Sequence, residues 1–342
     1  MKKFTKLFAC AAIVGILLLT FTACGSGVAE NNISDIGSSK TDIAKIGVIQ
    51  YAPHPSLDNC YKGFVQGLAE GGYVEGQNLQ ILFQNANGET STSDLIAKNF
   101  VSQKVDLIGA IATPAAMSAY SATQTGNKAP VVFTAVSDPV AAGIVQSLEA
   151  TGGNITGSCD VLPLDAQVKM IRAFLPEATK IGVLYTTSEP NSISHLSQLK
   201  EIAANYNFEV VDQGITSASE VNSGVNTLIA KGVDCINNFT DNNVVNNLAV
   251  VLQAAEKANI PVFGSEEEQV KNGCLASEGI DYVALGRETG LMAAKILKGE
   301  AIAVSLPVVT AASSKTYYNQ SVMQKLGVTL PADYVSATNL SE

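Results

Sequence analysis

The feature that most constrains the fold is a regular alternation of short apolar runs with amphipathic segments. Apolar runs at 46–49, 79–83, 106–111 and 131–133 alternate with helical spacing of apolar residues at 57–68 and 95–100 and with a third helix opened by Pro114. Buried strands that alternate with helices favour a parallel sheet covered by helices on both faces. The first half of the chain therefore predicts a doubly wound α/β unit.

The alternation pauses at the Gly-rich segment 151–157 and then restarts. Ile181-Gly182-Val183 repeats the Ile46-Gly47-Val48 that opens the first unit. Predicted strands at 208–211, 233–236 and 261–263 alternate with predicted helices near 192–204, near 219–230 and along 244–255. The sequence thus predicts an α/β protein with two similar doubly wound parallel-sheet lobes joined by a multi-strand hinge. Lobe 1 is expected to comprise 45–158 plus about 281–305, and lobe 2 residues 159–280. Residues 306–342 are expected to return across the hinge, and the sequence does not decide which of the two lobes they join.

The N-terminus has the pattern of a bacterial secretory signal. Three lysines in the first six residues precede an apolar stretch at 7–19 and small residues before Cys24. Phe21-Thr22-Ala23-Cys24 resembles a lipobox, which predicts a signal peptide at 1–23, lipidation of Cys24 and anchoring to the outside of the cell membrane. The alternative is an ordinary signal cleaved near Ala23. Residues 24–44 are rich in Gly, Ser and Asn and predict a flexible tether.

The charge balance disfavours nucleic acid as a partner. Lys and Arg number 21 and Asp and Glu number 31. Removal of residues 1–23 takes away three lysines, which moves the net charge from −10 to −13. Such a body lacks the basic surface that replaces phosphate counterions.

Motifs for metal binding and catalysis are missing from the sequence. Four cysteines follow Cys24, at Cys60, Cys159, Cys235 and Cys274, without CxxC spacing, and the chain has two histidines. We therefore predict neither a metal site nor a cofactor, and the disulfide state stays open. GxSxG, HExxH and GxxxxGK[ST] patterns do not occur, so we predict no catalytic residues.

Seven segments, in this order and spacing, resemble a known family over nearly all of 45–330. They are His54–Asp58, Gly72–Asn78, Ala112–Ala116, Val132–Val140, Gly152–Gly157, Thr240–Asn242 and Gly279–Tyr282. The family consists of bacterial ABC-type substrate-binding lipoproteins with a type I periplasmic-binding-protein fold, in the branch associated with tryptophan or tyrosine uptake. Ser265-Glu266 departs from the Ser-Asp-type pair that the family leads us to expect.

The resemblance implies a monomer that captures a small molecule between its lobes. The implied ligand is an amino acid, with an aromatic one favoured, and the implied partners are an ABC permease and its ATPase. A ligand sensor for a membrane signalling receptor stays open as an alternative, because a fold does not fix its output. A secreted enzyme is disfavoured.

The candidate ligand-binding residues come from the carboxyl ends of the predicted strands, where α/β sheets bind ligands. In lobe 1 they are Gln50, Tyr51, His54, Pro55, Asn85, Asn87, Thr113, Pro114, Ser137 and Asp138. In lobe 2 they are Tyr185, Asn191, Phe239, Thr240, Asp241, Asn242, Ser265 and Glu266.

Several candidates have two interpretations each. Thr113 opens a helix that suits a ligand carboxylate, or it is only an N-cap. Asp241 pairs with a ligand ammonium group, as the resemblance favours, or caps its own helix. Glu266 is a second choice for that role.

The aromatic candidates and the hinge complete the expectations. Tyr51, Tyr185 and Phe239 have two interpretations. They could sandwich an apolar part of the ligand, or they could cover the hydrophobic core at the strand ends. The hinge candidates are Asn154 and Thr156 at the first crossing and Asp281 and Tyr282 at the return.

Overall fold

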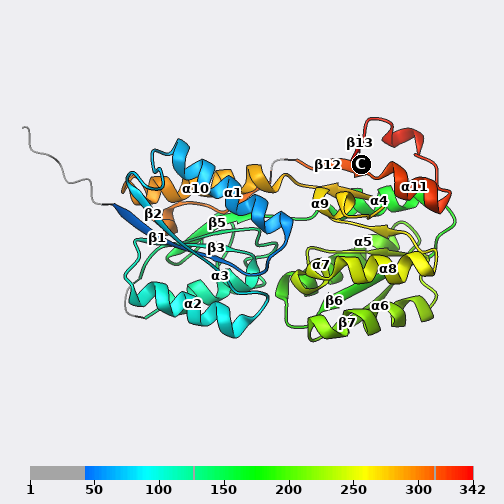
Figure 1. Ribbon diagram of the computed structural model, residues 1–342, viewed down its shortest axis with the longest axis horizontal. Helices are drawn as coiled ribbons and strands as arrows, with labels where there is room; N and C mark the ends of the chain where they lie inside the picture. Colours follow the sequence, from blue (N-terminus) through cyan, green and yellow to red (C-terminus); the bar gives the residue numbers. More distant parts are fainter. Residues whose placement is uncertain (1–42, 126–127, 312, 342) are drawn as a thin grey trace, which may run out of the picture. The chain divides into compact units, whose positions relative to one another are not determined.

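The computed structural model describes residues 43–125, 128–311 and 313–341. They form two lobes, each built on its own parallel sheet (Figure 1). The predicted signal peptide, Cys24 and the tether up to residue 42 lie outside the described residues. Ala44, which was assigned to the tether, is the first residue of strand β1. Among the described helices, none has the length and apolarity needed to cross a bilayer.

Lobe 1 contains a six-stranded parallel sheet in the order β11-β5-β4-β3-β1-β2. Its strands are β1 (Ala44–Gln50), β2 (Leu79–Asn85), β3 (Leu107–Ile111), β4 (Val131–Thr134), β5 (Ile155–Cys159) and β11 (Val309–Thr310). Helices α1 (Pro55–Glu70) and α10 (Tyr282–Leu297) cover one face, and α2 (Thr90–Ser102) and α3 (Thr113–Thr123) cover the other (Figure 1). The predicted doubly wound architecture is confirmed.

Glycines let α1 and α10 cross at backbone contact. Gly63 and Gly67 of α1 face Gly286 and Gly290 of α10. A Cβ atom on any of the four would overlap a backbone carbonyl oxygen of the other helix. The spacing of four residues in each helix places both glycines on the same face. This contact fixes α10, which follows the chain's return from lobe 2, onto lobe 1.

Lobe 2 contains a four-stranded parallel sheet in the order β7-β6-β8-β9. The strands are β6 (Lys180–Thr186), β7 (Glu209–Ile215), β8 (Cys235–Asn237) and β9 (Val262–Phe263). Its helices are α4 (Leu164–Phe174), α5 (Pro190–Ala204), α6 (Val221–Ala230), α7 (Asn242–Asn246), α8 (Leu248–Lys257) and α9 (Glu267–Lys271). The predicted helix along 244–255 was wrong in one respect, because the chain leaves helical geometry at Asn247 and divides the segment into α7 and α8.

A second sheet completes lobe 2. Strands β10 (Ala276–Gly279) and β12 (Lys315–Tyr318) pair antiparallel, and β13 (Thr338–Asn339) pairs parallel to β12. Helix α11 (Gln320–Leu326) follows β12. Residues 306–341 therefore divide between the lobes: β11 joins lobe 1 and the segment from β12 onward joins lobe 2.

Two segments connect the lobes wholly within the described residues: residues 160–163 after β5 and residues 280–281 after β10. The chain passes between the lobes again from β11 to β12, a stretch that includes residue 312, which lies outside the described residues. Asp281 and Tyr282 lie at the second crossing, where Asp281 caps α10. The expectation for Asn154 and Thr156 was wrong. Thr156 lies within β5 and donates to the Leu306 carbonyl at 2.9 Å, and Asn154 donates to the Ala129 carbonyl at 2.8 Å. Both residues belong to lobe 1, because β5 adds to its sheet before the chain crosses.

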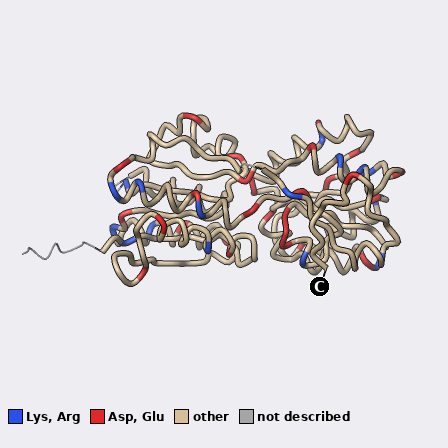
Figure 2. Tube along the Cα trace, turned by 90° about the horizontal axis from the view of Figure 1, so that it is seen from above, with Lys and Arg blue, Asp and Glu red and all other residues tan. Residues whose placement is uncertain are grey.

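Charges and thiols are distributed without a basic stripe or a crosslink among the described residues. Figure 2 shows acidic and basic residues interspersed over both lobes. Cys60, Cys159, Cys235 and Cys274 are free and buried. The disulfide state that the sequence left open is thus four separate thiols.

Candidate ligand-binding site

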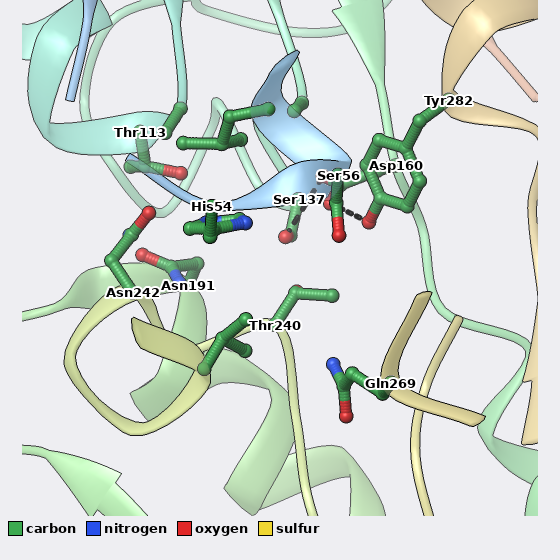
Figure 3. Close-up of a pocket in the computed structure, with 14 residues that line it drawn as sticks. His54, Ser56, Thr113, Ser137, Asp160, Asn191, Thr240, Asn242, Gln269 and Tyr282 are labelled. Atoms are coloured by element: carbon green, nitrogen blue, oxygen red, sulfur yellow. Dashed lines mark hydrogen bonds between the residues drawn. The ribbon is translucent and has the colours of Figure 1, made fainter. Parts of the chain in front are cut away.

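A narrow cavity lies where helix N-termini of the two lobes meet. Figure 3 shows His54, Thr113 and Ser137 of lobe 1 facing Asn191, Thr240 and Asn242 of lobe 2. Asp160 and Tyr282, from the first two crossings, complete one side. The remaining lining residues are Ser56, Leu57, Ala112, Ala135, Val245 and Gln269.

Several buried polar atoms around this cavity have no hydrogen-bond partner within the protein. They are both ring nitrogens of His54, Oγ of Ser56, Oδ1 of Asn191 and Oγ1 of Thr240. A buried polar atom without a partner costs about 1–3 kcal/mol. Unpartnered atoms of both lobes lie around the same cavity, so the cavity is complementary to a polar molecule that forms hydrogen bonds to both lobes.

The backbone is strained on the lobe 1 side of the cavity. Ala112 follows β3 with φ of 82°, and Ala135 follows β4 with φ of 55°. Both values lie in the left-handed region, which costs a residue with a Cβ atom about 1–3 kcal/mol. Because both alanines line the cavity, the strain lies where two strand ends border it.

His54 enters the cavity because of its place before Pro55. A residue that precedes proline favours extended geometry, and His54 has φ of −142° and ψ of 154°. Its carbonyl accepts hydrogen bonds from the Leu57 and Asp58 amides, which leaves the ring to face inward. Burial lowers the pKa of His54 to about 4, against the opposing effects of Asn242 and Asp58. The neutral ring offers one donor and one acceptor.

Thr113 is the first residue of α3 and lines the cavity. The first amides of a helix have no partner within the helix, and the helix dipole adds positive potential there. Together with the His54 ring, this end of α3 suits a carboxylate. Pro114, in the first turn of α3, is buried beside Thr113 and does not line the cavity.

Asp160 lines the cavity with a carboxylate that is 2% exposed. The Ser137 hydroxyl donates to Oδ1 at 2.9 Å, and the Tyr282 hydroxyl donates to Oδ2 at 2.8 Å. Burial raises the pKa of Asp160 to about 6, and the two hydroxyls oppose this rise. At pH 7, above this value, the ionised form of the side chain is favoured.

Asp241 is fully buried in lobe 2 and does not line the cavity. Its carboxylate accepts from the Thr186 amide at 2.6 Å, the Thr186 hydroxyl at 2.8 Å, the Ser192 hydroxyl at 2.7 Å and the Val244 amide at 3.0 Å. The last bond caps α7, as one interpretation of the sequence expected. These four donors occupy the carboxylate in this structure.

Glu189 accepts hydrogen bonds from two asparagines that line the cavity on the lobe 2 side. Its Oε2 accepts from the Asn242 amide at 3.1 Å, from the Asn242 side chain at 2.8 Å and from the Asn191 side chain at 3.2 Å. Burial and, secondarily, the Asp241 charge raise its pKa well above the usual range for a carboxyl. The two asparagines are thereby held in place for the cavity.

The three aromatic candidates lie outside the cavity lining. Tyr51 is buried and donates to the Gly88 carbonyl at 2.7 Å. Tyr185 packs against the lobe 2 core, and Phe239 is buried in that core beside His195. In this structure the three serve as the core residues that the alternative interpretation described.

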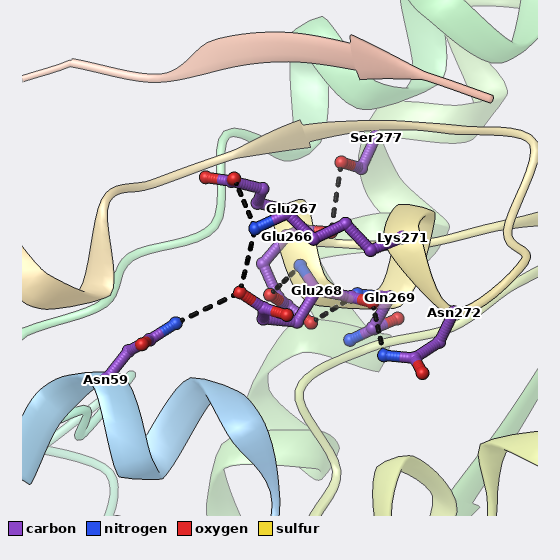
Figure 4. Close-up of polar contacts among 8 residues, drawn as sticks. All are labelled: Asn59, Glu266, Glu267, Glu268, Gln269, Lys271, Asn272 and Ser277. Atoms are coloured by element: carbon purple, nitrogen blue, oxygen red, sulfur yellow. Dashed lines mark hydrogen bonds and ion pairs between the residues drawn. The ribbon is translucent and has the colours of Figure 1, made fainter. Parts of the chain in front are cut away.

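Glu266 and Pro55 line a neighbouring groove that shares His54, Ser56, Val245 and Gln269 with the cavity. Both Glu266 oxygens cap α9, accepting from the Glu268 amide at 2.6 Å and the Gln269 amide at 2.8 Å (Figure 4). Burial raises the pKa of Glu266 to about 7. Glu268 in turn accepts from Asn59 of α1 at 3.1 Å, which joins the lobes beside the groove.

The other sequence candidates do not line the cavity. Gln50 donates to the Asp58 carboxylate at 2.7 Å, Asn85 accepts from the Asn87 amide at 2.8 Å, and Ser265 donates to the Asn238 carbonyl at 2.6 Å. Asp138 accepts from the Ala141 amide at 2.9 Å and from the Ser194 hydroxyl of lobe 2 at 2.7 Å. It therefore bridges the two lobes.

Sequence reasoning missed Asp160, Ser56 and Gln269, and it assigned Tyr282 to the hinge alone. Asp160 directly follows β5, a strand that was not recognised, so the strand-end rule would have found it. Ser56 lies in the first turn of α1, directly after the candidate Pro55. Gln269 lies on α9, a helix that the sequence did not predict, and carries no signal of its own.

The sequence model of the ABC transporter substrate binding protein family matches residues 45–339. A tyrosine-binding protein of Clostridioides difficile (strain R20291) is 40% identical over 321 residues, which cover 92% of this chain and 90% of the relative. The structure of an ABC domain in complex with L-Trp from Streptococcus pneumoniae superposes with a TM-score of 0.82 at 36% identity and covers 86% of this chain and 99% of that chain. These similarities confirm the predicted type I periplasmic-binding-protein fold.

A second solved structure is more similar to this chain in sequence but less similar in the arrangement of its lobes. A ligand-free, open substrate-binding protein with adhesive properties from Clostridium difficile is 40% identical and covers 87% of this chain and 99% of that chain. Its TM-score is 0.66, lower than that of the Trp complex despite the higher identity. The lobes of the present chain thus match the arrangement of the complex better than that of the open structure.

Proposed function

Because this chain belongs to the family of ABC transporter substrate-binding proteins, we propose that it captures an aromatic amino acid between its lobes for an ABC importer. The observation that carries the proposal is the cavity, in which unpartnered polar atoms of both lobes face the N-terminus of α3. The ligand class is supported by relatives described as binding tyrosine and L-Trp. The match to a transporter family does not favour the sensor alternative.

The cavity offers complementary groups for the common part of an amino acid. The first turn of α3, with Thr113 and the neutral His54 ring, would take the carboxylate. Asn191, Thr240 and Asn242 would add hydrogen bonds from lobe 2. A ligand that bonds to both lobes favours the closed arrangement, because the open arrangement cannot make both sets of contacts.

The remaining parts of the proposal concern location and partners. Residues 1–23 would direct export, and a lipid on Cys24 would hold the protein at the outer face of the cell membrane. A monomer in the closed arrangement would then dock on a permease that is driven by a separate ATPase. Treatment with globomycin, which blocks lipoprotein signal cleavage, should leave the uncleaved precursor in the membrane fraction.

The binding proposal is tested by thermal unfolding of the purified protein with a panel of amino acids, sugars, nucleosides and peptides. A ligand at 100 times its dissociation constant adds about 2.7 kcal/mol of stability. We expect tyrosine, tryptophan or phenylalanine to raise the melting temperature. A rise with sugars or nucleosides and with no amino acid would contradict the ligand class while leaving the family unchanged.

A further inference from the structure

We propose that Asp160 is the specificity-determining residue that binds the ligand's ammonium group. The inference rests on the proposed function and deepens it by assigning one half of amino-acid recognition to the crossing between the lobes. Sequence reasoning placed this role on Asp241 in lobe 2.

The carboxylate of Asp160 has no cationic partner in the described residues. Its carboxylate is 2% exposed and receives hydrogen bonds from two neutral hydroxyls. None of the ion pairs in the described residues involves it, and no lysine or arginine lines the cavity. A buried charge is costly unless it is paired. A cationic group of the ligand would supply the partner.

The Asp160 carboxylate also has spare hydrogen-bonding capacity. An ionised carboxylate has about four acceptor sites, and the hydroxyls of Ser137 and Tyr282 use two of those of Asp160. Figure 3 shows both hydroxyls beside the carboxylate at the cavity wall. An ammonium group in the cavity can therefore bind without displacing either.

The other buried acids near the cavity are engaged with partners inside the protein. The Asp241 carboxylate has four donors and does not line the cavity. Glu189 lies behind Asn191 and Asn242, and its raised pKa favours the neutral form. Glu266 uses both oxygens to cap α9. Asp160 is the buried carboxylate that lines the cavity and has free acceptor sites.

The position of Asp160 also links ligand recognition to the hinge. It is the first residue of the segment that leaves β5 for lobe 2, and its partner Tyr282 follows the second crossing. An ammonium group on Asp160 would contact the point where two crossings are already joined. Amino acids would then be distinguished from their deaminated analogues at the hinge.

The experiment is calorimetric titration of the purified protein and of Asp160→Asn. The ligands are L-tyrosine with 3-(4-hydroxyphenyl)propionate and L-tryptophan with indole-3-propionate. The analogues keep the ring and carboxylate but lack the ammonium group. We expect the wild-type protein to prefer the amino acid at least about tenfold, the factor expected for one charge-assisted hydrogen bond. In Asp160→Asn this preference should fall below about threefold, through weaker binding of the amino acid alone.

The matched control is Asp165→Asn, which removes the same charge from an exposed position at the start of α4. It should keep the wild-type preference. Asp160→Ser is a second neutral variant should Asp160→Asn fail to fold. An unchanged preference in a folded neutral variant overturns the inference and leaves the proposed function standing. If the wild-type protein binds neither amino acid, the proposed function fails and this inference fails with it.

Discussion

Burial of the Asp160 carboxylate in the cavity wall lowers the free energy of unfolding of the protein without ligand at neutral pH. Burial raises its pKa from the ordinary 3.8 to about 6, so the folded protein holds a proton at pH values where the unfolded chain has released it. Stability from this group is fully present below pH 4 and is lost as the pH rises toward 6. Groups that bind ligands commonly carry such a cost, because function needs what folding disfavours.

The stability of Asp160→Asn should therefore depend on pH in a defined way. Relative to the wild-type protein without ligand, the variant should gain about 2 kcal/mol between pH 4 and pH 7, since Asn does not ionise. Urea unfolding at several pH values measures this difference. A difference that stays constant over the range would show that the charge of Asp160 is not destabilising.

The strand-end rule predicted part of the site, but hydrogen bonding decided which acid faces the cavity. His54, Thr113, Ser137, Asn191, Thr240 and Asn242 were expected from the sequence, and all line one cavity. Asp241 and Asp160 both follow strands. The donors that occupy Asp241 come from Thr186 and Ser192, some 50 residues earlier in the chain. Such partners are visible only once the fold has brought them together.

At the scale of elements, long periodic segments were predictable and short ones were not. The strands that open the two units, at 46–49 and around 181–183, carry clear patterns, and the structure has β1 and β6 there. Strand β5 has the sequence ITGSC, with a single large apolar residue, and is recognisable only by its pairing with β4. Missing β5 placed the hinge too early and hid Asp160.

Where α1 and α10 cross, a Gly-to-Ala substitution has opposing effects on stability: helix propensity favours alanine, and packing disfavours it. Replacing Gly67 by alanine should favour the helix by about 1 kcal/mol from propensity alone. The new methyl group would overlap the Arg287 carbonyl oxygen, and overpacking costs about 1–3 kcal/mol or more. We expect Gly67→Ala to lower the melting temperature.

Ala69→Val, on the exposed face of the same helix, is the control and should change stability by less than about 1 kcal/mol. A higher melting temperature for Gly67→Ala would mean that the helices can separate without loss.

In the whole molecule, two side-chain hydrogen bonds outside the cavity lining join lobe 1 to lobe 2. Ser194 of lobe 2 donates to Asp138 at 2.7 Å, and Asn59 of lobe 1 donates to Glu268 at 3.1 Å. These bonds belong to the arrangement that superposes on the Trp complex with a TM-score of 0.82. They stabilise closure without belonging to the cavity lining.

Removal of the hydrogen bond from Ser194 to Asp138 should weaken the binding of every ligand by the same factor. A hydrogen bond contributes about 1 kcal/mol net, so Ser194→Ala should lower affinity about fivefold for an amino acid and its deaminated analogue alike. The exposed Ser197, on the same helix, provides the control Ser197→Ala, which should bind like the wild-type protein. Titration calorimetry distinguishes this uniform loss from the selective loss expected of Asp160→Asn. A loss for one ligand only would place Ser194 in the binding site instead.

We expect the cavity between the lobes to bind an amino acid, a claim that is checked by titration of L-tyrosine and L-tryptophan into the wild-type protein and into Thr240→Val. The substitution keeps the shape of the side chain and removes a hydroxyl that has no partner within the protein. We predict saturable one-to-one binding of at least one of the two amino acids, weakened about fivefold or more in the variant. Absence of binding, or binding of equal strength in both proteins, would contradict the claim.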